Sequence, residues 1–319
     1  MINKKRPLVV ISSCLLGELV RHNGGHCSDS WIMKELSKHV DFYSICPEVQ
    51  MNLGTPRDEI HLYYEENDKK SIRLKSKKTD EDLTERAHST YNTLNKELRK
   101  RKIDGFILTK KSPSCGLDGV KTIQKDNPKL VKQSTGLFAQ NIIDNFEFVP
   151  KIDSGRLNNK SLRENFIKSV FAHFSLTSID ASTNELQAFH RKYKYILMDH
   201  SPSKLKALGK IAATTSISNN VENKNKYYEL FFEVMKSEPS NHSRFNTLQH
   251  IMGYFKKHLS KDEKALLVEL LEDCKSGSYN YLVALKHLEL LTNKYKISYL
   301  NEQRYFSPYP KGLNLLREI

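Results

Sequence analysis

Three apolar, β-prone runs that each lead to a cysteine constrain the fold of this chain most strongly. They are Pro7–Cys14, Phe42–Glu48 and Gly105–Gly116, and each reaches its cysteine beside Ser, Pro or Gly. Short apolar runs bounded by turn residues predict buried strands. The segments between the runs are long enough for helical crossovers, so we expect the strands to form a parallel sheet.

The three cysteines of these runs, Cys14, Cys46 and Cys115, stand at the carboxyl ends of the predicted strands. Ligands bind at that edge of a parallel sheet, so the three thiols can converge although they are far apart in the sequence. Three thiolates can hold three corners of an iron–sulfur cluster and leave a fourth corner open. Buried structural cysteines are the alternative, and they are the default interpretation of Cys27 and Cys274.

Cysteine usage also bears on metal type and compartment. Five cysteines in 319 residues are too few for a disulfide framework, and clustered cysteines in a reducing compartment favour metal binding or catalysis. His22 and His26 beside Cys14 and Cys27 make zinc a competing interpretation, although no pair has compact CxxC spacing. No apolar run approaches the roughly 20 residues of a membrane span. The run after the basic residues 1–6 is too short for a signal peptide, so we expect a cytoplasmic protein without a membrane partner.

Further polar side chains in these turns suit catalysis. Glu48 follows the second cysteine by two residues and is a candidate general base, with a surface turn carboxylate as the alternative. The turn Lys110–Gly116 combines two hydroxyls, Ser112 and Ser114, with a cysteine and flanking lysines. Arg57 lies in a nearby turn where it can meet an anion.

The order of predicted elements indicates two domains. We expect residues 1–176 to form an α/β domain with a mainly parallel, Rossmann-like sheet that ends in a bridging helix. The polar stretch 175–184 marks the boundary. Residues 185–319 predict an all-α domain, in which Ser201-Pro202 starts one helix and Ser260–Glu263 forms a capping box at the start of another.

Three more elements are predicted in the first domain. The charged span Glu65–Lys78 predicts an exposed hairpin or loop. Thr79–Asp82 matches the start of a helix with a capping box. The apolar residues Phe146–Pro150 predict the last strand.

The net charge of +14 is spread over both halves of the chain. This balance favours an anionic partner, with nucleic acid as the leading class and a solvated, lysine-rich surface as the alternative. In Phe189–Lys194 and Asn246–His258, basic and aromatic residues alternate. This pattern suits RNA, although an ordinary solvated helix face would look the same. The candidate RNA contacts are Arg191, Lys192, Lys194, His250, Lys256 and Lys257.

The motifs of the first domain together resemble the thiouracil desulfidase family (TudS-like) from about Val9 to Val149. In order they are Ser13–Gly17, Arg21–His26, Cys46–Glu48, Leu53–Arg57, Ser112–Gly116 and Thr135–Ala139. The resemblance implies a 4Fe–4S cluster on Cys14, Cys46 and Cys115. The free iron of that cluster would take sulfur from a thiocarbonyl and leave an ordinary carbonyl.

The same resemblance implies roles for two further side chains. It places the family's catalytic glutamate on Glu48 and its catalytic serine on Ser112, with Ser114 as the alternative. The expected chemistry is hydrolysis of a C–S bond, in which Glu48 activates water and Ser112 relays a proton or orients the base. A redox enzyme that uses the same cluster and a non-catalytic, RNA-binding iron–sulfur sensor are the other two functions that fit.

The second domain resembles the helical domain of the longer, RudS-like members of this group. The matching segments are Phe189–Lys194, His200–Pro202, Leu248–Lys256 and Ser307–Pro310. The resemblance implies that the substrate is 4-thiouridine in tRNA, converted to uridine, with free thiouracil as a second substrate and the helical domain holding the RNA. Residues 241–246 depart from the Gly-Arg-His run that the family tends to show there. The sequence makes no prediction of the oligomeric state.

Overall fold

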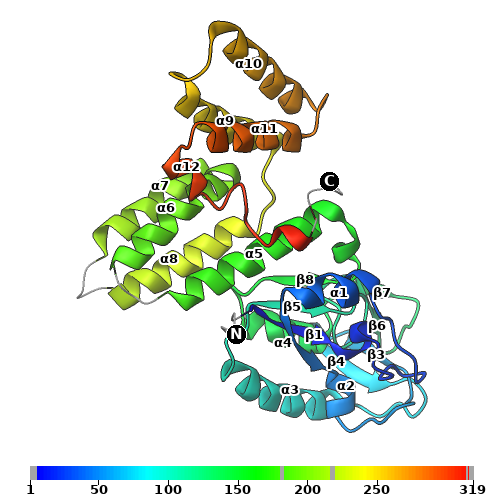
Figure 1. The fold of residues 1–319 in the computed structure, drawn as a ribbon. Coiled ribbons are helices and arrows are strands. Elements are labelled where there is room, and N and C mark those ends of the chain that lie inside the picture. Colours follow the sequence, from blue (N-terminus) through cyan, green and yellow to red (C-terminus); the bar gives the residue numbers. More distant parts are fainter. Residues whose placement is uncertain (1–5, 180–182, 216–219, 314, 316–319) are drawn as a thin grey trace. The chain divides into compact units, whose positions relative to one another are not determined.

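The structure is a computed structural model that describes residues 6–179, 183–215, 220–313 and 315. It contains two compact units, Met1–Phe166 and Ile167–Ile319, which Figure 1 shows as ribbons. Residues 180–182 of the predicted domain boundary and the basic residues 1–5 lie outside the described residues.

The division between the units falls inside one helix, α5 (Lys160–Ser178). The C-terminal half of this helix packs within the second unit. There, His173 Nε2 lies 2.8 Å from the Tyr228 hydroxyl, and the His173 ring contacts Phe232. The division into units thus falls within α5 at Phe166, whereas the polar stretch 175–184 overlaps the end of this helix.

The first unit is built on a parallel, four-stranded sheet in the order β2-β1-β5-β8. Its strands are β1 (Leu8–Ser12), β2 (Asp41–Ile45), β5 (Gly105–Leu108) and β8 (Lys151–Asp153). The three predicted strands that lead to cysteines are thus confirmed, and they are direct neighbours. Val9, Val10 and Ile11 of β1 are all buried, as expected for a parallel sheet that is covered on both faces.

The last strand of this sheet begins later than predicted. Phe146–Pro150 forms a turn, in which the Val149 N–H donates to the Phe146 carbonyl at 3.1 Å, and β8 follows it. The Phe146 ring packs on Phe106 with ring centroids 5.2 Å apart. The apolar character of this segment therefore reflects core packing rather than a strand.

A second four-stranded sheet, in the order β4-β3-β6-β7, goes beyond what the sequence patterns predict. Its strands are β3 (Ile60–Glu65), β4 (Asp68–Ser76), β6 (Val120–Gln124) and β7 (Val131–Ser134). β3 pairs antiparallel with β4 and parallel with β6, and β6 pairs antiparallel with β7. The predicted hairpin or loop at Glu65–Lys78 is the β3–β4 hairpin, but its Leu74 is fully buried rather than exposed.

Helices α3 (Thr84–Arg99) and α4 (Leu137–Asn145) enclose the main core of the first unit. Tyr91 of α3 and Phe138 of α4 meet edge to face with ring centroids 5.3 Å apart. Both sheets contribute to the same core, through Val10 and Leu62 among others. One core thus packs both sheets against these helices. This packing holds the turns that follow the strands of the parallel sheet.

The capping box predicted at Thr79–Asp82 is wrong, because α3 begins at Thr84 without a side-chain cap. The Asp82 carboxylate instead accepts hydrogen bonds from the Thr84 N–H at 2.9 Å and from the Tyr63 hydroxyl at 2.7 Å. Asp82 thereby ties the start of the helix to the second sheet. Short elements complete the unit: η1 (Ser13–Leu16), α1 (Ser30–Lys34), η2 (Leu36–Lys38), α2 (Pro47–Gln50) and η3 (Arg156–Asn158).

The described part of the second unit is helical, as predicted. Pro202 occupies the first turn of its helix, and Ser260 and Glu263 form the predicted capping box. Within the described residues, no helix is long and apolar enough to cross a membrane. The elements are α6 (Thr183–His200), α7 (Pro202–Thr214), α8 (Asn220–Met235), α9 (Asn241–Met252), η4 (Gly253–Phe255), α10 (Lys261–Ser276), α11 (Tyr281–Lys294), α12 (Ser298–Asn301) and η5 (Lys311–Leu313).

Candidate active site

The three predicted cysteines leave three adjacent strands at the same edge of the parallel sheet. Cys14 lies in η1 directly after β1, and Cys46 follows β2 as the N-cap residue of α2. Cys115 lies in the turn after β5. Because β1 stands between β2 and β5, the three carboxyl ends point to one region.

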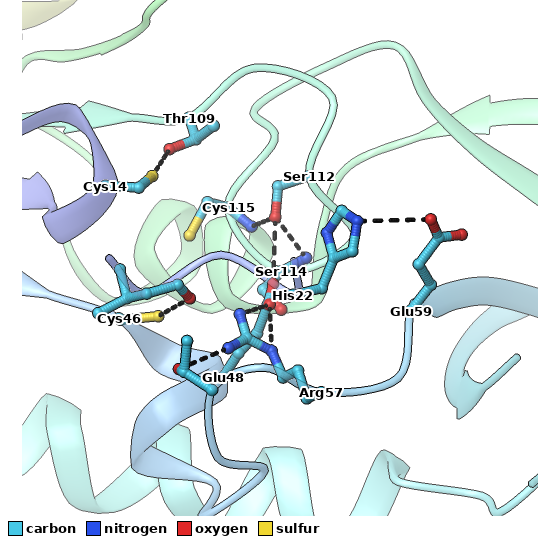
Figure 2. A network of polar contacts seen from close by, with 12 residues as sticks. Cys14, His22, Cys46, Glu48, Arg57, Glu59, Thr109, Ser112, Ser114 and Cys115 are labelled. Carbon is cyan, nitrogen blue, oxygen red and sulfur yellow. Dashed lines mark hydrogen bonds and ion pairs between the residues drawn. The ribbon is translucent and has the colours of Figure 1, made fainter. Parts of the chain in front are cut away.

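All three cysteines line one pocket of about 340 Å³. Figure 2 shows their side chains around this space together with Glu48 and Ser112, which also line it. The structure therefore brings together the five residues that the sequence assigned to the cluster and to catalysis. Apolar side chains complete the wall: Val20, Ile45, Pro47, Ile60 and Pro113.

The thiols of the pocket are buried. Cys115 is 5% exposed and Cys14 is 9% exposed, whereas Cys46 is half-buried. Burial raises the pKa of the Cys46 and Cys115 thiols above the ordinary range. A metal that displaces these protons would convert the thiols to thiolate ligands.

The donor set fits an iron–sulfur cluster in its chemistry, because such clusters take cysteine thiolates and this pocket offers three thiols from separate turns. Across the ranges that the structure describes, no three His, Cys, Asp or Glu side chains are arranged to hold a single metal ion.

Cys14 also contacts a fourth cysteine that sequence reasoning left as structural. The Cys27 N–H donates to the Cys14 carbonyl at 3.0 Å. The interaction between the two neighbouring thiols raises the pKa of Cys14 and lowers the pKa of Cys27 to about 6. The Thr109 hydroxyl lies 3.0 Å from Cys14 Sγ. Sequence spacing held no signal for this contact, because thirteen-residue separations are neither helical nor strand-like.

Glu48 is held by an arginine that the sequence placed only as a general anion contact. Arg57 Nε donates to Glu48 Oε2 at 3.0 Å, and Arg57 Nη2 contacts the same oxygen. The Glu48 side chain is 14% exposed and the Arg57 side chain is 4% exposed. Arg57 Nη1 donates to the Gly54 carbonyl at 2.9 Å, so the guanidinium is anchored on both sides. The anion that Arg57 meets is therefore the candidate base itself.

Ser112 is the serine that faces this carboxylate. Its hydroxyl donates to Glu48 Oε1 at 3.4 Å and accepts from the N–H groups of Ser114 at 3.2 Å and Cys115 at 3.1 Å. These two donors occupy the lone pairs of the oxygen, so the hydroxyl proton is directed at Glu48. Ser114 is fully buried and is not part of the pocket wall.

Cations surround the mouth of the pocket. Arg21, Lys110 and Lys111 line it with exposed side chains. His22 Nε2 lies 3.4 Å from Glu59 Oε1 on the same rim. Lys111 has a φ of +56°, a left-handed conformation that non-glycine residues rarely adopt and that often accompanies a functional turn. The rim therefore carries the exposed positive charges of Arg21, Lys110 and Lys111 beside the carboxylate of Glu59.

The predicted RNA contacts of the second unit gather around tyrosines. Lys194 Nζ lies 5.9 Å from the ring centroid of Tyr299, and Tyr254 stacks on that ring with centroids 5.7 Å apart. The stack joins η4 to α12, and Lys194 of α6 lies beside it. Lys256 and Lys257 follow η4 with exposed side chains.

The other predicted RNA contacts differ in their surroundings. Arg191 Nη2 donates to Glu302 Oε2 at 2.9 Å, so its charge is partly balanced. His250 is exposed near the end of α9, and Lys192 is half-buried.

The fold and the pocket define an α/β protein with a thiol-rich pocket beside a buried carboxylate, followed by a helical unit. Residues 9–154 match the family described as 2-thiouracil desulfurase. Residues 194–310 match a second family, described as a protein of unknown function (DUF1722).

Individual proteins are also similar to parts of the chain. The uncharacterized protein YbgA of Escherichia coli K12 is 28% identical over 128 residues, which cover 40% of this chain and 76% of that protein. The solved structure of a 4Fe–4S-dependent thiouracil desulfidase, TudS, is similar with 19% identity and a TM-score of 0.39. That match covers 51% of this chain and 100% of the TudS chain.

Proposed function

We propose that this chain is an iron–sulfur-dependent desulfidase of thiolated pyrimidines, acting in the cytoplasm on 4-thiouridine in tRNA and also on free thiouracil. The observation that supports this best is the convergence of three thiols, a carboxylate and a hydroxyl on one pocket, in the part of the chain that matches the desulfurase family. Cys14, Cys46 and Cys115 would hold a 4Fe–4S cluster. When bound, this cluster supplies a Lewis-acidic iron with an open position for the sulfur of a thiocarbonyl.

The reaction needs no electrons. Water supplies one oxygen to the carbonyl and two protons to hydrogen sulfide, so that C=S and H₂O become C=O and H₂S. The chain's own task is to deprotonate the water and to return protons to the departing sulfur. A redox enzyme on the same cluster would instead require an electron donor for each turnover.

Glu48 is the proposed base for that water. Arg57 binds only Oε2 of the carboxylate, and this leaves Oε1 directed to the Ser112 side of the pocket. A base within hydrogen-bond reach of its substrate proton typically contributes about 10²–10⁴-fold to the rate. Ser112 is close enough to Glu48 to pass a proton between the base and the reacting atoms.

The tRNA part of the proposal rests on charge and on the second unit. A free thiobase has no phosphate, so the net charge of +14 and the cationic pocket mouth have no partner in it. RNA supplies phosphates for the lysines and bases that can stack on exposed aromatic rings. Tyr254, which is 39% exposed beside Lys256 and Lys257, offers such a ring.

The test is sulfide release by the full chain after anaerobic reconstitution with iron and sulfide. The substrates are 4-thiouracil and tRNA that contains 4-thiouridine, each with and without an electron donor. We expect sulfide from both without a donor, and faster release from tRNA. Release that requires a donor would identify a redox enzyme, and RNA binding without release would identify a sensor.

The same preparation tests the three ligands. Cys46→Ala should lose most of the bound iron, because one of three anchoring thiols is removed. Cys274→Ala is the matched control, since this buried cysteine lies in the second unit and should leave the iron content unchanged. Full iron content in Cys46→Ala would contradict the ligand assignment.

A further inference from the structure

Cys27 lies directly against Cys14, the first of the proposed cluster ligands. The Cys27 N–H donates to the Cys14 carbonyl at 3.0 Å. Two cysteines joined through such a backbone hydrogen bond have Cα atoms no more than about 7 Å apart. Disulfides span Cα separations of about 4.4–6.8 Å, so this pair is within reach of a bond.

Local backbone structure produces this contact. Gly17, with a φ of +89°, ends η1 in a left-handed conformation that suits glycine, and the chain turns back from there. Residues after the turn then run beside η1, where the Asp29 N–H donates to the Leu15 carbonyl at 3.1 Å. The two backbone bonds, at Cys27 and at Asp29, hold the returning segment in register with Cys14.

The two cysteines differ in what they face. Cys14 lines the pocket and is 9% exposed. Cys27 is half-buried and is not part of the pocket wall. A small oxidant can therefore reach Cys27 from outside the pocket, and Cys14 is the thiol that can resolve the product from within.

We propose that Cys14 and Cys27 form a disulfide when Cys14 is not occupied by the cluster, and that this bond blocks reloading of the cluster. The oxidant is a low-molecular-weight disulfide. The Cys27 thiolate attacks one of its sulfurs, which forms a mixed disulfide and releases one thiolate. The Cys14 thiolate then attacks the Cys27 sulfur and releases the second thiolate. Two protein thiols are oxidised, the small disulfide is reduced to two thiols, and the two protein protons go to those thiols.

The consequence for the site follows from the ligand count. A disulfide on Cys14 leaves Cys46 and Cys115 as the only pocket thiols, which is too few for the proposed three-point attachment. This consequence rests on the proposed function, whereas formation of the bond does not. The apoprotein would thus be held in a reversible, reductant-dependent state, protected from further oxidation of Cys14.

The experiment uses the full-length apoprotein, treated anaerobically with oxidised glutathione or with buffer alone. Differential alkylation and peptide mass spectrometry should show a peptide pair linked through Cys14 and Cys27. Reconstitution with iron and sulfide should then fail for the treated protein and recover after dithiothreitol. Cys27→Ser should reload equally with and without dithiothreitol, and Cys274→Ser should behave as wild type.

Three outcomes would overturn the proposal. They are glutathione adducts without the linked peptide, a bond from Cys14 to Cys46, and loss of the cluster in untreated Cys27→Ser, which would make Cys27 a ligand. Peptide mapping requires neither cluster nor activity. A linked peptide in a chain that never binds iron would therefore refute the proposed function while leaving the disulfide established.

Discussion

At the scale of single residues, Glu48 is the side chain on which the proposed chemistry most depends. Glu48→Gln keeps the shape of the side chain and removes the base, so we expect bound iron to be unchanged and sulfide release to fall by about 10²–10⁴-fold. Iron analysis and a sulfide assay measure the two effects. Glu59→Gln is the matched control, because this rim carboxylate contacts Lys77 and lines the same pocket. Equal rates in the two variants would argue against Glu48 as base.

The two serines of the cysteine turn provide a second comparison of residues. Ser112→Ala should slow sulfide release by at least about 10-fold, because the hydroxyl that contacts Glu48 is removed. Ser114→Ala should keep most of the rate, since its hydroxyl is buried outside the pocket wall. Rates of both variants, measured at equal iron content, decide between them. A slow Ser114→Ala beside a normal Ser112→Ala would reverse the assignment.

Residue types could be predicted from the sequence better than residue partners. The convergence of Cys14, Cys46, Cys115 and Glu48 on one edge of the sheet was predictable, because each of them follows a strand that the sequence marks. The pairing of Arg57 with Glu48 was not, since it depends on how the turn at Gly54 folds back to anchor the guanidinium.

At the scale of elements, the start of α4 holds the turn that contains Ser112 and Cys115. The Gly136 N–H donates to the Gly116 carbonyl at 2.8 Å, and the Ala139 N–H donates to the Ser114 carbonyl at 2.9 Å. A Cβ on Gly136 would lie 2.6 Å from the Ser114 carbonyl oxygen and 2.8 Å from that of Ser112. Only glycine therefore allows this approach of helix and turn.

Gly136→Ala should consequently displace the turn. We expect a loss of about 1–3 kcal/mol in the free energy of unfolding, as for other overpacked sites, together with reduced iron content. Denaturant unfolding and iron analysis measure both. Gly253→Ala is the control, because a Cβ there meets no atom within 4 Å. A Gly136→Ala protein with normal stability and iron would show that the turn does not need this contact.

Strands with a long or regular apolar sequence could be predicted, and short or charged strands could not. β1 and β5 are almost entirely buried, so their apolar sequences are distinctive, whereas β2 is half-buried or exposed except for Ile45 and was marked by its aromatic residues and the following Cys46-Pro47 turn. β8 has only three residues and follows an apolar turn. The turn has the more strand-like sequence, so the strand was predicted at Phe146–Pro150, before its actual start. The second sheet escaped prediction because β4 and β7 are charged, half-exposed strands whose register depends on their neighbours.

At the scale of the whole molecule, the net charge of +14 predicts how tRNA affinity responds to salt. Affinity should fall steeply as salt rises, since each neutralised phosphate releases counterions. Replacing Lys256 and Lys257 with Ala should flatten the slope of log K against log salt by about one unit per lost phosphate contact. Binding titrations at several salt concentrations measure this slope.

A charge-matched control separates specific contacts from total charge. Lys275 and Lys286 lie on other helices of the second unit and contact Glu272 at 3.3 Å and Glu289 at 2.6 Å, respectively. Replacing both with Ala removes the same charge and should change the slope less. Identical slopes for the two double variants would indicate that tRNA affinity depends only on the total charge of the protein and that the predicted RNA contacts are wrong.

The central claim is that a cluster anchored by three cysteines presents an open iron to the thiocarbonyl within reach of Glu48. The most direct measurement is Mössbauer spectroscopy of the full chain, reconstituted anaerobically with ⁵⁷Fe and recorded before and after addition of 4-thiouracil. The account predicts a four-iron signal in which one iron of the four changes its parameters when the thiobase is added. A chain without cluster iron would contradict it, and so would a cluster whose four irons keep the same Mössbauer parameters after the thiobase is added.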